Sequence, residues 1–339
     1  MAIKRNIITR KISPKLKWGV AGCGRFMELN FLPTFQQLKR SKLISVYSRK
    51  LERAILIADE FSAEKAYNNF DEFLKSDFDA LYIGSENRNH YEQVIKAANA
   101  GKHILCEKPL AMNSEQAEEM VKVCKENNVL LSVNFTHQFH PLVTKAKELI
   151  KSGIIGKIVT INVSFNIDYA PDTNFRFDKL KSGGGPLRDL GSHMLNLLSY
   201  FGGTVTEIDG WLDNIIYSSK VEDFAMGMVK FKKTGYGYFN VSYNVRQPIN
   251  RIEIIGFNGN IIIDNIIGSR GMSGKLIIDL PFEAKKAFRK KANKLLYALR
   301  SVQTSFITNK KPRITGEDGL INMRLMEQLE SKCAQKKNS

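Results

Sequence analysis

The stretch VAGCGRFM, residues 20–27, decides the expected fold because it follows directly on a short apolar run. Gly22 and Gly24 form a Gly-x-Gly pattern, and Met27 stands where a dinucleotide-binding loop usually has its third glycine. The first glycine permits a tight turn, and the second lets a pyrophosphate approach the backbone. The helix that follows would offer free N–H groups and its positive dipole end to the phosphates. An ordinary strand-to-helix turn has the same pattern, so the loop alone leaves both readings open.

Strand-like and helical segments alternate around this loop through the first 134 residues. Strands are expected at 16–22, 42–48, 79–85, 102–108 and 129–135, and helices at 31–39, 50–61, 69–76, 91–101 and 114–128. Ser114 is the expected N-cap of the last of these helices. Strands that alternate with helices predict βαβ units and a doubly wound parallel sheet.

From about Phe135 onward the sequence becomes rich in β-forming residues. Strands are expected within 157–169, 206–216, 223–233, 235–245, 250–264 and 274–279, with a hairpin turn at Phe257–Asn260. Antiparallel pairing in one sheet is the natural interpretation. The chain closes with two expected helices, so the fold class is α/β: a parallel doubly wound sheet followed by an α+β domain with a large, mostly antiparallel sheet.

Composition limits the class of protein. The chain has 339 residues, 43% hydrophobic and 25% charged, which is typical of a globular protein with two domains. No apolar run approaches a membrane span, and the basic start, residues 1–14, lacks the apolar core of a secretory signal. The four cysteines, Cys23, Cys106, Cys124 and Cys333, show no metal-ligand spacing. A cytoplasmic protein without disulfides or metal is expected.

The formal net charge of +17 raises the question of a polyanionic partner. No basic patch interleaved with aromatic residues forms a recognised nucleic-acid motif, so no nucleic-acid partner is expected. Much of the charge lies in Glu283–Arg300, where apolar residues recur at helical spacing and predict one amphipathic helix. A helix packed on the domain with a solvated charged face is the favoured interpretation. The alternative is an interfacial helix that binds an anionic membrane surface.

Charged residues at one strand end indicate where chemistry could occur. Glu107, Lys108 and Pro109 follow the apolar run 104–106, and ligands of α/β folds bind at strand ends. Asp189 and His193 are four residues apart and would share one face of a helix. A histidine can move a proton near neutral pH, and a cation can stabilise alkoxide character. Lys108 and His193 could therefore flank one hydroxyl, with Glu107 orienting Lys108.

The end of the second strand predicts the choice of cofactor. An acidic residue at this position would bind the ribose hydroxyls of NAD. The chain has Ser48, Arg49 and Lys50 here and no acid. A hydroxyl and two cations suit a 2′-phosphate, so NADP is expected in preference to NAD. The alternative is that Arg49 and Lys50 only begin a solvated helix.

Two longer segments carry a family resemblance. They are SENRNHYEQVIKAANAGKHILCEKPLA at 85–111 and SGGGPLRDLGSHMLNLLSYFGG at 182–203. With the glycine loop they resemble the glucose–fructose oxidoreductase, inositol dehydrogenase and MocA-type (Gfo/Idh/MocA) family over about residues 15–335. The resemblance implies a Rossmann domain over 15–134 and a substrate-binding and oligomerisation domain with an open sheet over 135–339. It also implies a C-terminal helix that can pack back on the first domain, a nicotinamide cofactor, a sugar or cyclitol substrate and a homo-oligomer.

The resemblance and the residues together give a set of expected site residues. Lys108, Asp189 and His193 would be catalytic, with Lys108 also touching the nicotinamide ribose. The expected cofactor-binding residues are Gly22, Gly24, Arg25, Phe26, Ser48, Arg49, Lys50, Ser85, Asn87, His90, Glu107 and Lys108. The expected substrate contacts are His137, Asp168 and Tyr169. The sequence departs from many relatives at Ser85–Glu86, where Thr-Pro is common, and at His137–Gln138, where arginines are common.

Three functions remain open from the sequence. The first is an NAD(P)-dependent dehydrogenase or reductase of a sugar, sugar derivative or cyclitol. The second is a glycosidase-like enzyme that retains and recycles its nicotinamide. The third is a non-catalytic NAD(P)-binding regulator, against which the presence of Lys108, Asp189 and His193 argues.

Overall fold

The computed structural model describes residues 15–267 and 273–338, and the basic start of the chain lies outside these ranges. The first domain is built on a parallel sheet with strand order β3-β2-β1-β4-β5-β6. Its strands are β1 (Leu16–Ala21), β2 (Ser41–Tyr47), β3 (Lys65–Tyr67), β4 (Ala80–Ile83), β5 (His103–Cys106) and β6 (Leu131–Val133). The strand order reverses between β1 and β4, which opens a crevice at the carboxyl ends of these two strands. The predicted doubly wound parallel sheet is confirmed.

Helices cover both faces of this sheet. They are η1 (Met27–Phe31), α1 (Leu32–Phe35), α2 (Leu51–Phe61), α3 (Phe70–Leu74), η2 (Asn87–Asn89), α4 (His90–Asn99) and α5 (Ser114–Glu126). Residues of α1 and α2 share one hydrophobic core with Trp18, while residues of α4 and α5 share the other with Ile104. The expected N-cap at Ser114 is wrong by one residue. The side chain of Asn113 accepts the N–H of Gln116, and Ser114 begins the helix.

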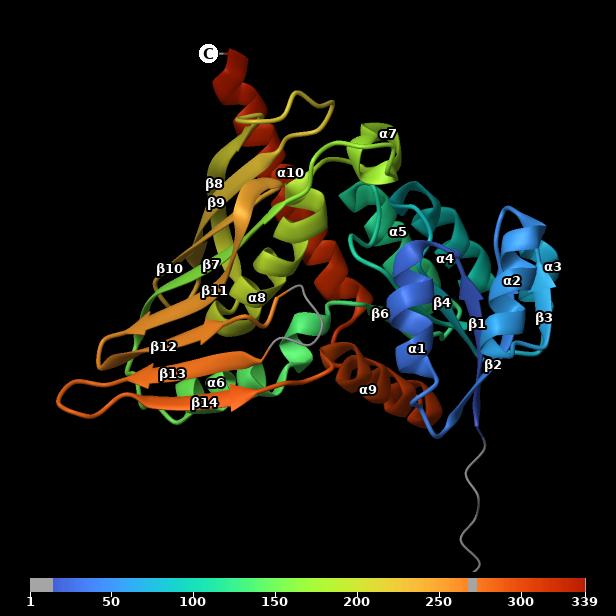
Figure 1. Cartoon of the computed structure of the whole chain (residues 1–339), viewed down its shortest axis with the longest axis horizontal. Coiled ribbons are helices and arrows are strands. Elements are labelled where there is room, and N and C mark those ends of the chain that lie inside the picture. Colours follow the sequence, from blue (N-terminus) through green and yellow to red (C-terminus); the bar gives the residue numbers. More distant parts are fainter. Residues whose placement is uncertain (1–14, 268–272, 339) are drawn as a thin grey trace, which may run out of the picture.

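The second domain is built on an eight-stranded sheet with order β14-β13-β12-β11-β7-β10-β9-β8 (Figure 1). Its strands are β7 (Ile158–Asp168), β8 (Val205–Asp213), β9 (Phe224–Phe231), β10 (Tyr236–Ser242), β11 (Asn244–Gly256), β12 (Gly259–Asp264), β13 (Gly274–Asp279) and β14 (Lys286–Lys290). All neighbours are antiparallel except β7 and β10. The predicted hairpin forms, with Phe257 and Asn258 between β11 and β12. The mostly antiparallel sheet is therefore confirmed.

Helices cover one face of the large sheet and leave the other face open (Figure 1). The chain between the two sheets forms η3 (Thr136–Phe139) and α6 (Pro141–Lys151), and after β7 it forms η4 (Phe175–Phe177), α7 (Lys179–Ser182), η5 (Leu187–Gly191) and α8 (Ser192–Gly202). Burial alternates along β9 and β10, where Val229 and Phe239 are buried and Met228 and Tyr238 are exposed. This alternation is typical of a sheet with one face toward a core and one toward solvent.

The last two helices return to the first domain. In α9 (Lys294–Thr308), the ring of Phe306 lies 5.7 Å from that of Trp18, between ring centroids. In α10 (Gly316–Asn338), Glu327 accepts the backbone N–H of Ser114 at 2.7 Å, while Lys336 bonds Asp209 of β8 at 2.6 Å. These contacts join the two domains along the length of α10 (Figure 1).

The single amphipathic helix expected over Glu283–Arg300 is wrong. The segment divides into the edge strand β14 and the first turns of α9, and Asn293 caps that helix by accepting the N–H of Leu296. Lysines are well tolerated on an edge strand because they discourage pairing with another chain. The apolar residues Leu295 and Leu299 belong to the core beside Trp18, so they are not free to enter a membrane. The interfacial-helix alternative therefore loses its basis.

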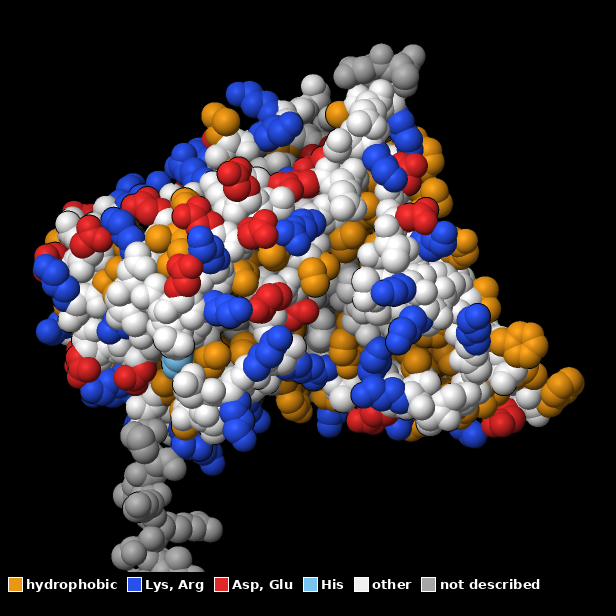
Figure 2. All heavy atoms as spheres, turned by 180° about the vertical axis from the view of Figure 1, so that it is seen from behind, with side chains coloured by type: hydrophobic (Ala, Val, Ile, Leu, Met, Phe, Trp, Pro, Cys, Tyr) orange, Lys and Arg blue, Asp and Glu red, His pale blue; other side chains and the backbone are white. Residues whose placement is uncertain are grey.

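The excess of positive charge is distributed over the surface. On the face seen in Figure 2, Lys and Arg side chains cover both domains with acidic side chains among them. Within residues 15–267 and 273–338, no helix is long and apolar enough to cross a membrane.

Candidate active site

A cavity of about 850 Å³ lies where the two domains meet, at the carboxyl ends of the parallel strands. The first domain contributes the turn after β1 and the ends of β2, β4 and β5. The second contributes residues 174–193 and the start of α9. Most of the expected site residues line the cavity, namely Gly22, Gly24, Arg25, Phe26, Ser48, Arg49, Lys50, Ser85, Asn87, Glu107, Lys108, His137, Asp189 and His193.

The glycine turn has the shape that a dinucleotide requires. Gly22 has a φ of +97°, and a Cβ at this position would lie 2.5 Å from the backbone nitrogen of Ser85. Any larger residue would therefore push apart the ends of β1 and β4. Gly24 has open space where its Cβ would stand, so a ligand can reach its backbone. These features fit the pyrophosphate of a nicotinamide dinucleotide, with residues 22–26 as its cradle.

Arg49 and Lys50 follow the end of β2 and line the cavity. Arg49 bonds the carboxylate of Glu86 at 3.1 Å, and its side chain is 61% exposed. Arg53 lies farther on, in α2. Its guanidinium donates a hydrogen bond of 2.6 Å to the carboxylate of Glu28 and another to the carbonyl of Cys23. Because its side chain is largely exposed, Arg49 can exchange Glu86 for a ligand, whereas Arg53 braces the glycine turn.

The segment after β4 supports the cavity wall. Asn87 donates a hydrogen bond of 2.8 Å to the carbonyl of Ser182, which ties the first domain to the second. His90 was expected to contact the cofactor, but it is fully buried and does not line the cavity. Its two ring nitrogens lie 3.0 Å from the carbonyl of Pro109 and 3.2 Å from that of Ser85. His90 therefore fixes the two strand ends relative to each other.

Glu107 is anchored inside the first domain. Its carboxylate accepts hydrogen bonds from the Tyr82 hydroxyl at 2.9 Å and from the Asn134 amide at 2.5 Å. Burial raises the pKa of this carboxyl, against the opposing effects of Asn134 and Lys108. These contacts fix the backbone from which Lys108 projects, so Glu107 acts as a positioning residue.

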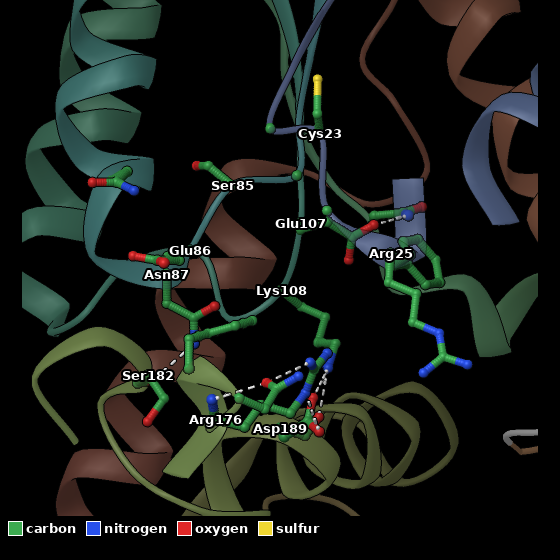
Figure 3. A pocket seen from close by; sticks show the side chains of 18 of the residues that line it. Cys23, Arg25, Ser85, Glu86, Asn87, Glu107, Lys108, Arg176, Ser182 and Asp189 are labelled. Atoms are coloured by element: carbon green, nitrogen blue, oxygen red, sulfur yellow. Dashed lines mark hydrogen bonds and ion pairs between the residues drawn. The ribbon is translucent and has the colours of Figure 1, made fainter. Parts of the chain in front are cut away.

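Lys108 crosses from the first domain to the second (Figure 3). Its ammonium donates to a carboxylate oxygen of Asp189 at 2.5 Å and to the carbonyl of the same residue at 2.7 Å. The other oxygen of Asp189 accepts hydrogen bonds from Arg176 at 3.0 Å and from the hydroxyl of Tyr243 at 2.8 Å. Burial opposes the charged form, but Arg176 and Lys108 hold the pKa of Asp189 well below its usual range. Asp189 is therefore an ionised anchor for Lys108.

Two histidines lie together beside Lys108. The ring centroids of His137 and His193 are 4.2 Å apart. Burial, followed by the charges of Lys108 and Lys294, lowers the pKa of His193 well below its usual value. Its imidazole is therefore neutral at pH 7 and able to accept a proton. Asp189 and His193 line the same cavity from neighbouring turns, as their spacing predicted.

Two expected substrate contacts lie elsewhere. Asp168 is exposed at the end of β7 and accepts the hydroxyl of Tyr217 at 2.5 Å. Tyr169 packs against Phe177 and Tyr243, with ring centroids 5.1 Å and 5.4 Å away. Neither residue lines the cavity.

Four residues important to the site were not predicted. Arg176 and Tyr243 bind Asp189, Asn134 binds Glu107, and Lys294 lines the cavity beside the histidines. They come from four separate segments, and none belongs to a motif. Within the described ranges, no group of three or more His, Cys, Asp or Glu side chains could hold a metal ion.

Comparison with known proteins identifies the two domains. Residues 16–135 match the oxidoreductase family with an NAD-binding Rossmann fold, and residues 143–262 match the GFO/IDH/MocA C-terminal domain. The scyllo-inositol 2-dehydrogenase (NADP(+)) of Bacillus subtilis is 32% identical over 70% of this chain and 72% of its own length. The myo-inositol 2-dehydrogenase of Thermotoga maritima is 25% identical over 91% of this chain and 94% of its own length.

Solved structures show the same fold. The aldose–aldose oxidoreductase of Caulobacter crescentus superimposes with a TM-score of 0.88 at 22% identity, covering 95% of this chain and 98% of its own. A levoglucosan dehydrogenase in complex with NADH gives 0.86 at 21% identity, with the same coverage. The two family models match residues of both sheets. The chain therefore belongs to the Gfo/Idh/MocA oxidoreductase family, with an N-terminal NAD-binding Rossmann domain.

Proposed function

We propose that this chain transfers a hydride between a nicotinamide cofactor and the hydroxyl- or keto-bearing carbon of a sugar, sugar derivative or cyclitol. The observation that carries the proposal is the meeting of Lys108 and His193, from different domains, in one cavity that also contains the glycine turn. Relatives that act on inositols and sugars support the substrate class.

Residues of this chain can carry out every proton and charge step of alcohol oxidation. A nicotinamide dinucleotide held by the glycine turn would supply the acceptor for the hydride of the alcohol carbon. The ammonium of Lys108 stabilises negative charge that develops on the substrate oxygen. The neutral imidazole of His193 takes the hydroxyl proton. Asp189, held by Arg176 and Tyr243, keeps the Lys108 side chain in place.

A substrate panel tests this function. Purified protein with NADP or NAD is mixed with neutral sugars, acidic sugars, nucleotide sugars and cyclitols, and cofactor reduction is followed by absorbance. Net reduction of added cofactor supports the dehydrogenase. Conversion of a glycoside without net reduction would favour the glycosidase-like alternative, and tight cofactor binding without any turnover would favour the regulator.

NADP is expected to bind more tightly than NAD. Ser48, Arg49 and Lys50 line the cavity, and no acid stands at the end of β2. Arg49→Gln should reduce the preference for NADPH over NADH by about tenfold, because a charged hydrogen bond to the 2′-phosphate is lost. Fluorescence titration with both cofactors measures this. Arg40→Gln, at the opposite end of β2, should change nothing, and equal or tighter NADH binding by the unmodified protein would reject the preference.

We also propose a homo-oligomer that pairs through the open face of the large sheet. Trp211, Met228, Tyr236 and Tyr238 are each at least 40% exposed on β8, β9 and β10, and Tyr238 lies opposite Met228 in the ladder. Tyr238→Lys should convert the assembly to monomers, because it places charge in an apolar interface. Light scattering during gel filtration measures the mass. Phe257→Lys, at an exposed hairpin, is the control, and an unchanged mass for Tyr238→Lys would contradict this interface.

A cytoplasmic location is the remaining proposal. Cys23, Cys106 and Cys124 form no disulfide in the part of the chain that the structure describes, which suits a reducing compartment. Fractionation of the source cells checks this.

A further inference from the structure

Lys294, at the start of α9, brings a cation into the cavity that the reaction described above does not use. Its ammonium donates a hydrogen bond of 2.7 Å to the carbonyl of Ile266. It lines the cavity on the side of His137 and His193. Burial alone lowers the pKa of this ammonium to about 7, and across the described ranges no carboxylate offsets that effect. Lys294 is thus a partly buried amine that is protonated only in part at neutral pH, and an anion beside it would favour its charged form.

The acidic residues of the cavity wall are already engaged elsewhere. Asp189 binds Lys108 and Arg176, Glu107 binds Tyr82 and Asn134, Glu86 binds Arg49 and Arg88, and Glu92 binds Lys96. None of these carboxylates can turn to Lys294 without breaking a pair. A partly buried charge is stable only when it is paired, so the missing partner should come from the contents of the cavity.

His137 is a second, independent indication of a ligand at this place. Its side chain is only 5% exposed, and neither ring nitrogen has a hydrogen-bond partner in the described structure. After burial, the charge of Lys294 is the largest effect that lowers the pKa of His137, so its imidazole is neutral. A neutral imidazole carries one N–H donor and one acceptor, and leaving both unbonded in a buried place is unfavourable.

We propose that Lys294 and His137 form an anion subsite beside His193, and that the substrate is an acidic sugar derivative with a carboxylate or phosphate group. An anionic oxygen would supply the counter-charge of Lys294 and accept the N–H of His137. The hydroxyl of a neutral sugar could satisfy His137 but would leave Lys294 unpaired. The substrate class rests on the proposed function, whereas the subsite itself does not depend on turnover.

Simple anions test the subsite without any assumption about the sugar. Inorganic phosphate and acetate are titrated by calorimetry into the full chain saturated with NADPH, so that the site for the 2′-phosphate is filled. Lys294→Gln should weaken binding of the preferred anion about ten- to a hundredfold, since it replaces a charged hydrogen bond with a neutral one. Lys294→Arg should retain most of the affinity.

A second variant, which removes a lysine outside the cavity, is the control for Lys294→Gln. Lys291→Gln removes an exposed charge three residues earlier, outside the cavity, and should bind like the unmodified protein. If Lys294→Gln also binds like the unmodified protein, or if neither anion binds to any form, the subsite is rejected and Lys294 only tethers the carbonyl of Ile266. Thermal unfolding of each variant shows that the fold is retained.

Matched sugars then distinguish the source of the anion. D-glucose is compared with D-glucuronate and with D-glucose 6-phosphate, and myo-inositol with its monophosphate, for both binding and turnover. A carboxylate subsite favours glucuronate, and a phosphate subsite favours the phosphorylated members. Turnover of neutral and anionic members at equal kcat/KM would overturn the substrate class and leave the dehydrogenase function standing. Anion binding that depends on Lys294, without turnover of any compound, would support the subsite and reject the dehydrogenase function.

Discussion

Replacing Lys108 with methionine is expected to lower kcat by about a hundred- to a thousandfold, the usual effect of removing one group that stabilises a developing oxyanion. The ammonium is the cation that reaches from the first domain to Asp189 in the second. Methionine keeps the length and apolar stem of the side chain but provides no charge and no donor. Steady-state rates with the best substrate of the panel measure the change.

The same variant should fold and bind cofactor. Asp189 keeps its bonds to Arg176 and Tyr243 when Lys108 is lost, so its carboxylate stays paired. Thermal unfolding and NADPH titration check these two points. Lys122→Met, which removes an exposed lysine of α5, is the control and should retain full activity. Near-normal turnover by Lys108→Met would remove Lys108 from the reaction.

The fold was predictable where the pattern of apolar residues is local. The alternation of strands and helices in the first domain and the alternating burial in the second both depend on neighbours within a few residues. The segment Glu283–Arg300 shows the limit of this approach. Phe288 and Leu295 are seven residues apart and fit one helical face, but Phe288 lies on an edge strand and Leu295 on a helix. Pairing of β14 with β13 outweighed the helical spacing of the apolar residues in this segment.

The site was predictable in part, because three of its residues stand in two motifs. Lys108 follows β5, and Asp189 and His193 lie one helical turn apart, so local spacing together with the family resemblance singled them out as candidates. Arg176, Tyr243 and Lys294 could not be found in this way. Arg176 and Lys294 line the cavity and Tyr243 binds Asp189, but all three come from segments outside the two motifs. The motif residues carry the proposed chemistry, and these unpredicted residues set their charge and position.

Replacing His193 with glutamine is expected to lower kcat about a hundred- to ten-thousandfold, as for other general bases. The pH profile gives a more specific prediction. Four groups face this imidazole: Lys108 and Lys294 lower its pKa together with burial, Asp189 raises it, and neutral His137 lies against the ring. The base must be unprotonated for oxidation. In the unmodified protein, kcat/KM should therefore stay level as the pH falls through 6.5 and decline only at lower pH.

His193→Gln should remove that decline along with most of the rate, because glutamine does not titrate. Profiles of kcat/KM for alcohol oxidation, measured for both proteins from pH 8 downward with the cofactor saturating, make the comparison. A decline centred at or above the ordinary histidine pKa of 6.5 would mean that His193 is not the base. The profile of kcat/KM reports the enzyme before the substrate binds, so a bound anion cannot account for such a decline.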